Sequence, residues 1–299
     1  MSMQLKLIDT DKKIVKSKKS GIVNIASVPQ RSPFRYPGGK TWFVPTLRKW
    51  LSSKSKRPEL LIEPFAGGGI VGLTAAFENL AERVLLIELD PNVAAVWEVL
   101  IDGDYEGLAK KILNFNLSYE SAKSTLERAP KSTDDKAFHT ILRNRVSHGG
   151  IMAPGAGLIK NGENGKGISS RWYPQTLARR IRDIGSIRSK ISFVQGDALK
   201  EIEDFCDDKN TAFFIDPPYT AAGKKAGRRL YSHHSLDHDL LFKMMKYSKG
   251  DVLFTYDNSE DLVELASSHN FETQLIPMKN THHAEMTELI VGKDLKWLK

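Results

Sequence analysis

The sequence feature that most constrains the fold is an apolar run stopped by two prolines, at residues 213–219 (FFIDPPY). The three apolar residues are typical of a buried parallel strand. Proline fixes its own φ angle and disfavours helix in the residue before it, so the chain leaves this strand extended. Asp216 is thereby placed at the carboxyl end of a strand, where open α/β sheets bind ligands. An ordinary strand-to-loop exit would have the same pattern, so this run alone does not decide between the two.

A glycine-rich turn follows an earlier apolar run. Residues 60–64 (LLIEP) predict the first core strand, and residues 65–72 (FAGGGIVG) predict a tight turn into a helix. The turn contains the G-x-G-x-x-G spacing, which lets the backbone approach a ligand at the edge of a sheet. Glu88 ends the next predicted strand, 84–88, where an acidic side chain can bind a ribose diol. These features predict a cofactor that contains adenosine, and they leave its kind open.

Strand and helix patterns alternate along most of the chain. Strands are predicted at residues 60–64, 84–88, 191–195, 213–215, 252–256, 271–277 and 288–291. Helices are predicted at residues 41–52, 71–79, 106–114, 119–128, 177–187 and 235–248. Such alternation predicts an α/β fold with a doubly wound, mostly parallel seven-stranded sheet.

The stretch between residues 102 and 189 has a different character. It contains helical patterns and then a glycine-rich, basic loop over residues 149–167, long enough to indicate a functional or disordered segment. Arginines interleaved with Trp172 and Tyr173 suit phosphate contacts and base stacking, although a solvated insertion with its aromatics packed on the core would share this composition. We therefore expect a basic arm at 1–30, a catalytic domain at 31–101 and 190–299, and an inserted, mainly helical recognition domain at 102–189.

Composition narrows the class of protein. The net charge of +8 and pI near 9.3 favour a polyanionic partner, of which nucleic acid is the commonest. The single cysteine rules out an internal disulfide, and the adjacent histidine pairs lack the spacing of a metal site, so no metal is expected. The sequence shows neither a membrane-spanning apolar run nor a signal-type segment, which predicts a cytoplasmic protein.

Three motifs in order resemble those of Dam-type (D12 class, alpha-group) adenine-N6 DNA methyltransferases. They are RYPGGK at residues 35–40, EPFAGGG at residues 63–69 and DPPY at residues 216–219. The resemblance spans roughly residues 31–291 and includes the order of cofactor motif, recognition insertion and catalytic tetrapeptide. It implies a Rossmann-like class I methyltransferase that uses S-adenosyl-L-methionine and acts on double-stranded DNA, in some cases beside a cognate restriction endonuclease.

The resemblance also assigns roles to individual residues. Catalysis falls to Asp216, Pro217 and Tyr219, with Asp216 between cofactor and target base. Cofactor binding falls to Tyr36, Lys40, Glu63, Phe65, Ala66, Gly67, Gly69, Glu88, Asp197 and Asp216; Glu88 would hold the ribose and Asp197 the adenine amine. DNA contacts are expected at Asn144, Arg145, Lys160, Arg171, Trp172 and Tyr173.

The chemistry agrees with these residue types. The N6 amine of adenine is a poor nucleophile, and a carboxylate and a carbonyl that accept its two hydrogens would direct its lone pair at the methyl group. Alternatives are another methyl acceptor, such as RNA adenine or cytosine N4, an NAD-dependent oxidoreductase using the same glycine turn, and a catalytically silent DNA-binding module. Aspartate at position 216 favours adenine, because resembling families place Ser or Asn there for other acceptors.

Overall fold

The computed structural model describes residues 27–36, 39–152, 156–162, 165–218, 236–279 and 285–298. Its strands form one seven-stranded sheet in the order β3-β2-β1-β4-β5-β7-β6. The strands are β1 (Leu60–Glu63), β2 (Arg83–Glu88), β3 (Ile191–Gln195), β4 (Thr211–Ile215), β5 (Asp251–Asp257), β6 (Glu272–Lys279) and β7 (Glu285–Gly292). β1 to β5 pair in parallel, while β7 is antiparallel to both β5 and β6. The predicted doubly wound, mostly parallel seven-stranded sheet is confirmed.

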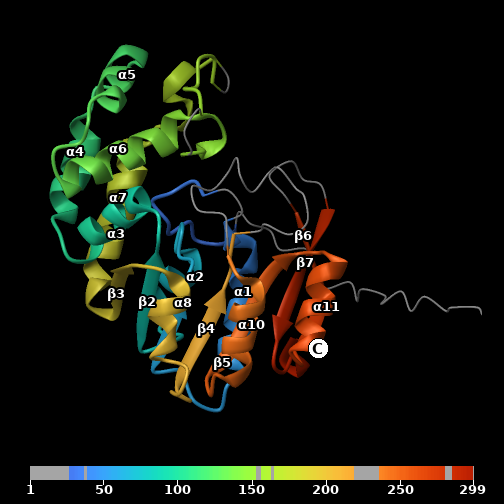
Figure 1. Ribbon diagram of the computed structural model, residues 1–299. Helices are drawn as coiled ribbons and strands as arrows, with labels where there is room; N and C mark the ends of the chain where they lie inside the picture. The colour runs from blue at the N-terminus through green and yellow to red at the C-terminus, as the bar shows by residue number, and fades with distance from the viewer. Residues whose placement is uncertain are drawn as a thin grey trace, which may run out of the picture.

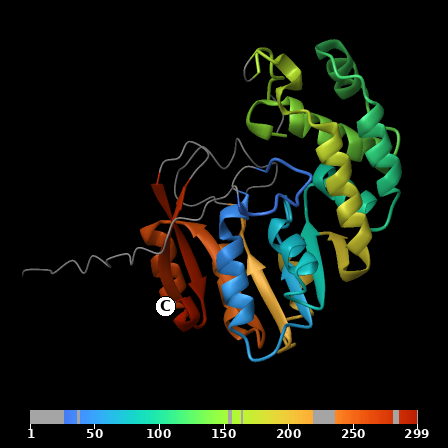
Figure 2. The ribbon, with the colours of Figure 1, turned by 180° about the vertical axis from the view of Figure 1, so that it is seen from behind.

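Helices cover both faces of the sheet (Figures 1 and 2). They are α1 (Val44–Ser52), α2 (Ile70–Phe77), α3 (Pro91–Ile101), α4 (Tyr105–Asn114), α5 (Tyr119–Glu127), α6 (Thr133–Val146), α7 (Pro174–Ile187), α8 (Ala198–Glu203), α10 (His238–Tyr247) and α11 (Glu260–Ser268). Side chains alternate between the two faces of a strand, and the core divides accordingly. Leu61 and Phe214 pack with α1, α2 and α3, whereas Ile62 and Phe213 pack with α8, α10 and α11.

Side-chain caps fix where several helices begin. The Asp90 carboxylate accepts from the backbone N–H of Asn92 at 2.8 Å, and Pro91 occupies the first turn of α3. Asp237 caps α10 in the same way, with its carboxylate 2.9 Å from the backbone nitrogen of Leu240. Each such cap satisfies a backbone N–H that the helix leaves open, which stabilises the fold by roughly 1 kcal/mol.

A helical segment, α4 to α7, lies between α3 and β3 in the chain and stands above the sheet at upper left in Figure 1. α4 packs against α7, and α6 packs against α3. Its buried side chains, among them Phe138 and Leu177, belong to the same cluster as Leu61 of the sheet. The predicted domain boundaries at residues 102 and 189 are not tested by this continuous packing and remain a prediction.

No helix within the described ranges combines the length and the apolar character that crossing a bilayer requires.

The turn before α2 depends on a glycine with a left-handed backbone. Gly69 has φ +60°, and a Cβ added there would lie 2.6 Å from the Trp97 ring. We expect Gly69→Ala to lower the free energy of unfolding by about 2–4 kcal/mol, because it combines backbone strain with overpacking. Denaturant unfolding measures the loss.

Gly165→Ala is the matched control. Gly165 also has a positive φ, +71°, but an added Cβ would meet nothing within 4 Å. Strain alone should therefore cost about 1 kcal/mol there. Equal losses in the two variants would contradict the close contact with Trp97.

Candidate active site

The candidate site lies where neighbouring parallel strands end. β1 lies between β2 and β4, and β4 lies beside β5, so their carboxyl ends meet at one edge of the sheet. Glu63 ends β1, Glu88 ends β2 and Asp216 follows β4 directly. The topology therefore brings together acidic residues that are far apart in the sequence, as the motif order predicts.

Asp216 is held at this edge by two donors. Its Oδ1 lies 2.8 Å from Nζ of Lys40 and accepts a hydrogen bond from Oγ1 of Thr255 at 2.9 Å. Lys40 comes from a 3-10 turn, Lys40–Phe43, that leads into α1, and Thr255 is a buried residue of β5. The Asp216 side chain remains 21% exposed, whereas that of Lys40 is only 5% exposed. The carboxylate is thus fixed from behind and reachable from the open edge.

Lys40 also pairs with a second carboxylate that the sequence analysis did not identify. Its Nζ lies 3.1 Å from Oε1 of Glu288 in β7, whose side chain is 7% exposed. Burial alone would lower the pKa of Lys40, but the charges of Asp216 and Glu288 outweigh it and raise that pKa above its usual value. The available sequence signal was an acidic side chain directly before the apolar run of the last strand, in residues 288–291 (ELIV).

Glu63 is buried beneath the turn rather than exposed to a ligand. Its Oε2 accepts a hydrogen bond from the backbone N–H of Gly72 at 2.6 Å, which anchors the start of α2 to the sheet. Burial raises the pKa of Glu63 to about 8, and the nearby charge of Asp216 acts in the same direction.

The glycine turn is a tight cradle. The Tyr36 ring lies against it, since a Cβ added at Gly67 would be 2.7 Å from that ring. The carbonyl of Gly67 accepts from Nε1 of Trp97 at 3.0 Å. Ala66 is buried, with its N–H bonded to the carbonyl of Ile87 at 2.9 Å. Phe65, which is partly buried, packs with the cluster on the opposite face of the sheet.

The neighbouring acids are placed to bind a polar ligand. Glu88 accepts from the backbone N–H groups of Gly67 and Asp90, each at 2.8 Å, and burial raises its pKa to about 7. Asp197 is exposed, and its Oδ1 caps α8 through the N–H of Leu199 at 2.9 Å. A turn without side chains, with a carboxylate at the end of each of two adjacent strands, fits the predicted adenosine-containing cofactor.

The other catalytic predictions are placed in part. Pro217 is buried directly after β4, and Tyr219 lies outside the described residues, as do Pro37 and Gly38. The sequence analysis did not identify Tyr256 of β5, the strand beside β4. Tyr256 is fully buried, and its hydroxyl lies 3.0 Å from Nδ1 of His238. Burial and the nearby charge of Asp216 raise the pKa of Tyr256 well above its usual value.

Among the residues that the structure describes, no cluster of metal-ligating side chains occurs.

Asn144, predicted to contact DNA, is fully buried and hydrogen-bonds to two separate segments of main chain. Its carboxamide accepts from the backbone N–H of Arg35 at 2.8 Å and donates to the carbonyls of Arg35 and Gly150, each at 2.9 Å. All three bonds go to main chain, so the side chain holds the RYPGGK segment against α6. This placement favours a structural role for Asn144 over direct contact with a ligand.

Arg145 is buried among other arginines. Its guanidinium donates to the carbonyl of Pro33, and its Nε has no hydrogen-bond partner. The residue as a whole is 5% exposed. Burial, with the charges of Arg180, Arg35 and Arg171, lowers its pKa. A buried cation beside further cations is costly.

The remaining predicted DNA residues differ in exposure. Lys160 and Tyr173 are exposed, and the Tyr173 hydroxyl donates to the carbonyl of Ser170 at 2.9 Å. Arg171 is partly exposed. Trp172 is only 8% exposed and packs edge-on against Phe115, with ring centroids 5.9 Å apart, so it belongs to the core of the helical segment.

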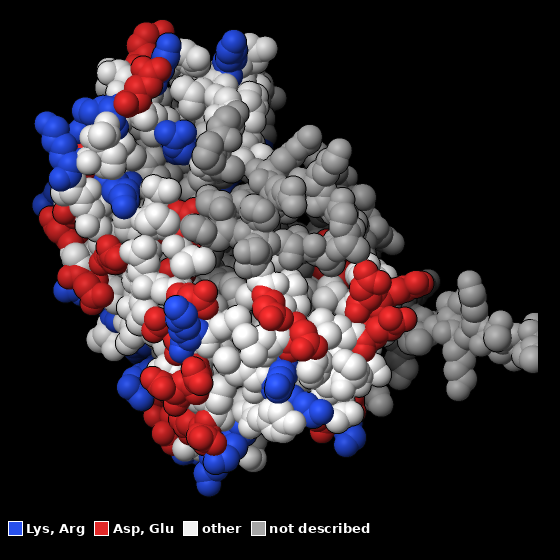
Figure 3. All heavy atoms as spheres, viewed as in Figure 1, with Lys and Arg blue, Asp and Glu red and all other residues white. Residues whose placement is uncertain are grey.

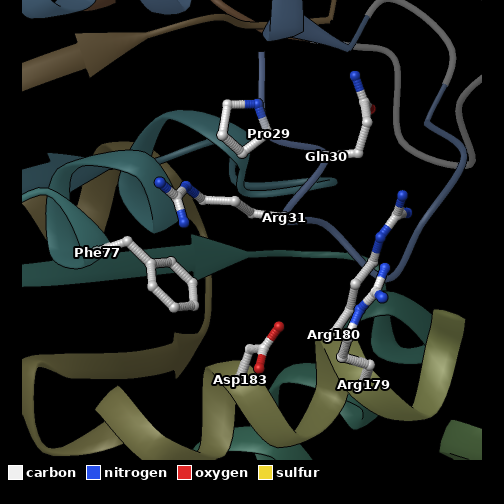
Figure 4. Close-up of a pocket in the computed structure, with 7 residues that line it drawn as sticks. All are labelled: Pro29, Gln30, Arg31, Phe77, Arg179, Arg180 and Asp183. Carbon is white, nitrogen blue, oxygen red and sulfur yellow. The ribbon is translucent and has the colours of Figure 1, made fainter. Parts of the chain in front are cut away.

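A separate cavity of about 280 Å³ lies between the N-terminal segment and α7. Figure 4 shows Arg31 and Phe77 on one side of it, Arg179 and Arg180 on the other, and Asp183 between them. Arg180 is held in place by a hydrogen bond to the carbonyl of Ser32 at 3.0 Å, while Arg179 is exposed. In Figure 3, Lys and Arg side chains gather over the helical segment at upper left, and acidic side chains are more frequent over the lower half.

Comparison with known families agrees with this site. The model of the D12 class N6 adenine-specific DNA methyltransferases matches residues 36–136, less than half of the chain. That match contains Lys40, Glu63 and the glycine turn, and it confirms the resemblance over these residues. No curated protein matches the chain.

Solved structures similar to the chain are distant. A putative RNA methyltransferase from Pyrococcus horikoshii has 11% identity and a TM-score of 0.40, over 90% of this chain and 92% of that one. The rRNA methyltransferase aviRa from Streptomyces viridochromogenes has 13% identity and a TM-score of 0.39, over 86% of this chain and 85% of that one. Similarities this low indicate no substrate. On the family match and the fold described above, the protein is a methyltransferase.

The raised pKa of Glu63 predicts how stability depends on pH. The native protein holds a proton there up to about pH 8, whereas the unfolded chain releases it near 4.5. The folded state binds more protons in this window, so the free energy of unfolding falls as the pH rises through it. Glu63→Gln should flatten that fall, as measured by denaturant unfolding at several pH values.

Glu264→Gln, on the exposed face of α11, is the control and should keep the slope of the unaltered protein. Part of the slope below about pH 7 should persist in Glu63→Gln, because burial also raises the pKa of Glu88 to about 7. A slope as steep as that of the unaltered protein would contradict the contribution of Glu63.

Proposed function

We propose that the protein transfers the methyl group of S-adenosylmethionine to N6 of an adenine in double-stranded DNA. The observation that carries the proposal is the placement of Asp216. The carboxylate is fixed 2.8 Å from Nζ of Lys40 and 2.9 Å from Oγ1 of Thr255, and it is still 21% exposed. It lies at the edge of the sheet where the glycine turn follows β1. A reachable acceptor beside a cofactor cradle is the arrangement that methylation of an amine needs.

The methyl donor is S-adenosylmethionine, which supplies a methyl group activated by a sulfonium. Gly67, Gly69, Ala66 and Phe65 would form the turn beneath it, and Tyr36 would lie over that turn, against which it already packs. Glu88 would bind the ribose hydroxyls and Asp197 the adenine amine. Glu63 would act from below, by holding the start of α2.

Asp216 and Pro217 would direct the target nitrogen. Asp216 accepts one hydrogen of the N6 amine and the Pro217 carbonyl the other, which turns the nitrogen lone pair toward the methyl group. The N–C bond forms as the S–C bond breaks, and the amine then loses one proton, which Asp216 can take up and release to water. Alignment of this kind supplies on the order of 7–11 kcal/mol of barrier reduction.

The target adenine must leave the duplex to reach Asp216. Extrusion costs a few kcal/mol. Stacking on Tyr219 would offset roughly 1–3 kcal/mol of that cost, as it does for single-stranded bases.

The helical segment supplies the DNA surface. Lys160, Arg171 and Tyr173 are partly or fully exposed and would contact the DNA directly. Asn144, Arg145 and Trp172 would act by supporting them, since their side chains are buried. Arg179 extends this surface toward the cavity of Figure 4. A cognate restriction endonuclease would be the natural partner if the enzyme protects a site against cleavage.

Asp216→Asn should lower methyl transfer at least about a thousandfold, because the change removes the negative charge and replaces one acceptor oxygen by an NH2 group, which would face either the amine or the donors Lys40 and Thr255. Binding of S-adenosylmethionine, measured by calorimetry, should change little. Mass spectrometry of nucleosides should show N6-methyladenine in DNA that the unaltered protein has methylated. N4-methylcytosine, transfer to RNA alone, or full activity in the variant would overturn the proposal.

Arg179→Ala should weaken DNA binding and reduce the slope of log K against log salt by about one, as for the loss of one phosphate contact. Arg182→Ala on the same helix is the control, because Arg182 is already bound to Glu106 by two hydrogen bonds of 2.7 and 2.9 Å. Equal slopes in both variants would place the DNA elsewhere.

A further inference from the structure

Glu288 is a buried carboxylate at the site to which neither the motifs nor the proposed chemistry assigns a role. It lies on β7, opposite Asp257 of β5 in the antiparallel pair. Its side chain is 7% exposed, and its Oε1 is 3.1 Å from the ammonium that also binds Asp216. A buried charge is expensive unless it is paired, so this arrangement has a cost that a neutral residue would avoid.

We infer that Glu288 is a positioning residue for methyl transfer, which acts through Lys40 to keep the negative charge of Asp216 available to the target amine. This inference rests on the proposed function. Lys40 is one cation shared by two carboxylates, at 2.8 and 3.1 Å, so the three groups carry one net negative charge. With Asp216 as its only carboxylate partner, the ammonium would cancel the charge that the amine needs.

The charge matters because the reaction moves positive charge onto the target nitrogen. As the N–C bond forms and the S–C bond breaks, the charge leaves the sulfur and develops on N6, next to Asp216. Fixed negative charge at that position stabilises the transition state more than the ground state. Glu288 also gives Lys40 a second carboxylate partner, so that the ammonium is shared between Asp216 and Glu288 when the amine arrives.

Other polar groups surround the three. The buried carboxyl of Glu63 lies close enough to interact with Asp216 and Lys40, and the Tyr256 hydroxyl interacts with Asp216 while it bonds to His238. Asp216 follows β4, and Glu288 lies in β7, on the other side of β5 in the sheet. Glu288 therefore pairs with Lys40 from a different strand than the one that carries Asp216.

The first test compares Glu288→Gln with the unaltered protein in steady-state methylation of DNA. We expect kcat to fall about tenfold or more, which corresponds to about 1.4 kcal/mol of barrier. The KM for S-adenosylmethionine, and its affinity by calorimetry, should stay within about twofold, because the cradle is untouched. Glu288→Asp, which restores the charge, should recover part of kcat.

The second test asks whether the effect passes through Lys40. In a Lys40→Met background, Glu288→Gln should change kcat less than about threefold, because the cation that it balances is gone. The double variant should also be more stable than Lys40→Met alone, in which Glu288 is buried without its ammonium. This stability difference can be measured even if turnover in that background is too low.

The outcomes separate the two proposals. An unaltered protein that methylates no DNA would overturn the proposed function and this inference with it. An active protein whose Glu288→Gln variant keeps its kcat, or loses affinity for S-adenosylmethionine in parallel with kcat, would overturn the role of Glu288 alone. An equal loss with and without the charge of Lys40 would also overturn it.

Discussion

The ammonium of Lys40 is the interaction on which the arrangement of the site depends. It comes from the turn before α1, and it joins the residue after β4 to a residue of β7, so it links the beginning, the middle and the end of the chain. A cation with 5% exposure is stable only with partners, and here it has two carboxylates. The same contact that satisfies the buried lysine orients Asp216 toward the open edge.

The fold provides this site through the geometry of parallel strands. Carboxyl ends of adjacent strands meet at one edge, and each acid there has a different environment. Glu63 is buried and has a pKa near 8, Glu88 is bound by two backbone N–H groups, and Asp216 is bound by a cation and a hydroxyl. The three carboxyl groups at this edge therefore differ in their partners: backbone N–H groups bind Glu63 and Glu88, whereas the side chains of Lys40 and Thr255 bind Asp216.

The sequence predicted the sheet well because its signals are local. Apolar runs, glycine turns and prolines mark each strand of the sheet, and Gly67, Glu88 and Asp216 lie where the motif order places them. Glu288, Thr255 and Tyr256 were missed because their contacts form only when β5 and β7 pair with each other and lie beside β4, and no local pattern records this. Trp172 was expected at the DNA because of its chemical type, and Asn144 because of the family resemblance. Both are buried by contacts between segments distant in the sequence, Trp172 with Phe115 and Asn144 with the main chain at Arg35.

The carboxamide of Asn144 has a consequence for the changes that the helical segment can accept. One side chain of α6 holds the main chain at both Arg35 and Gly150, and Arg35 is only a few residues from Lys40 in the sequence. A change in the helical segment would therefore have to preserve these bonds, or else release the main chain that leads to Lys40. Surfaces of the segment away from Asn144 can vary without loosening that connection.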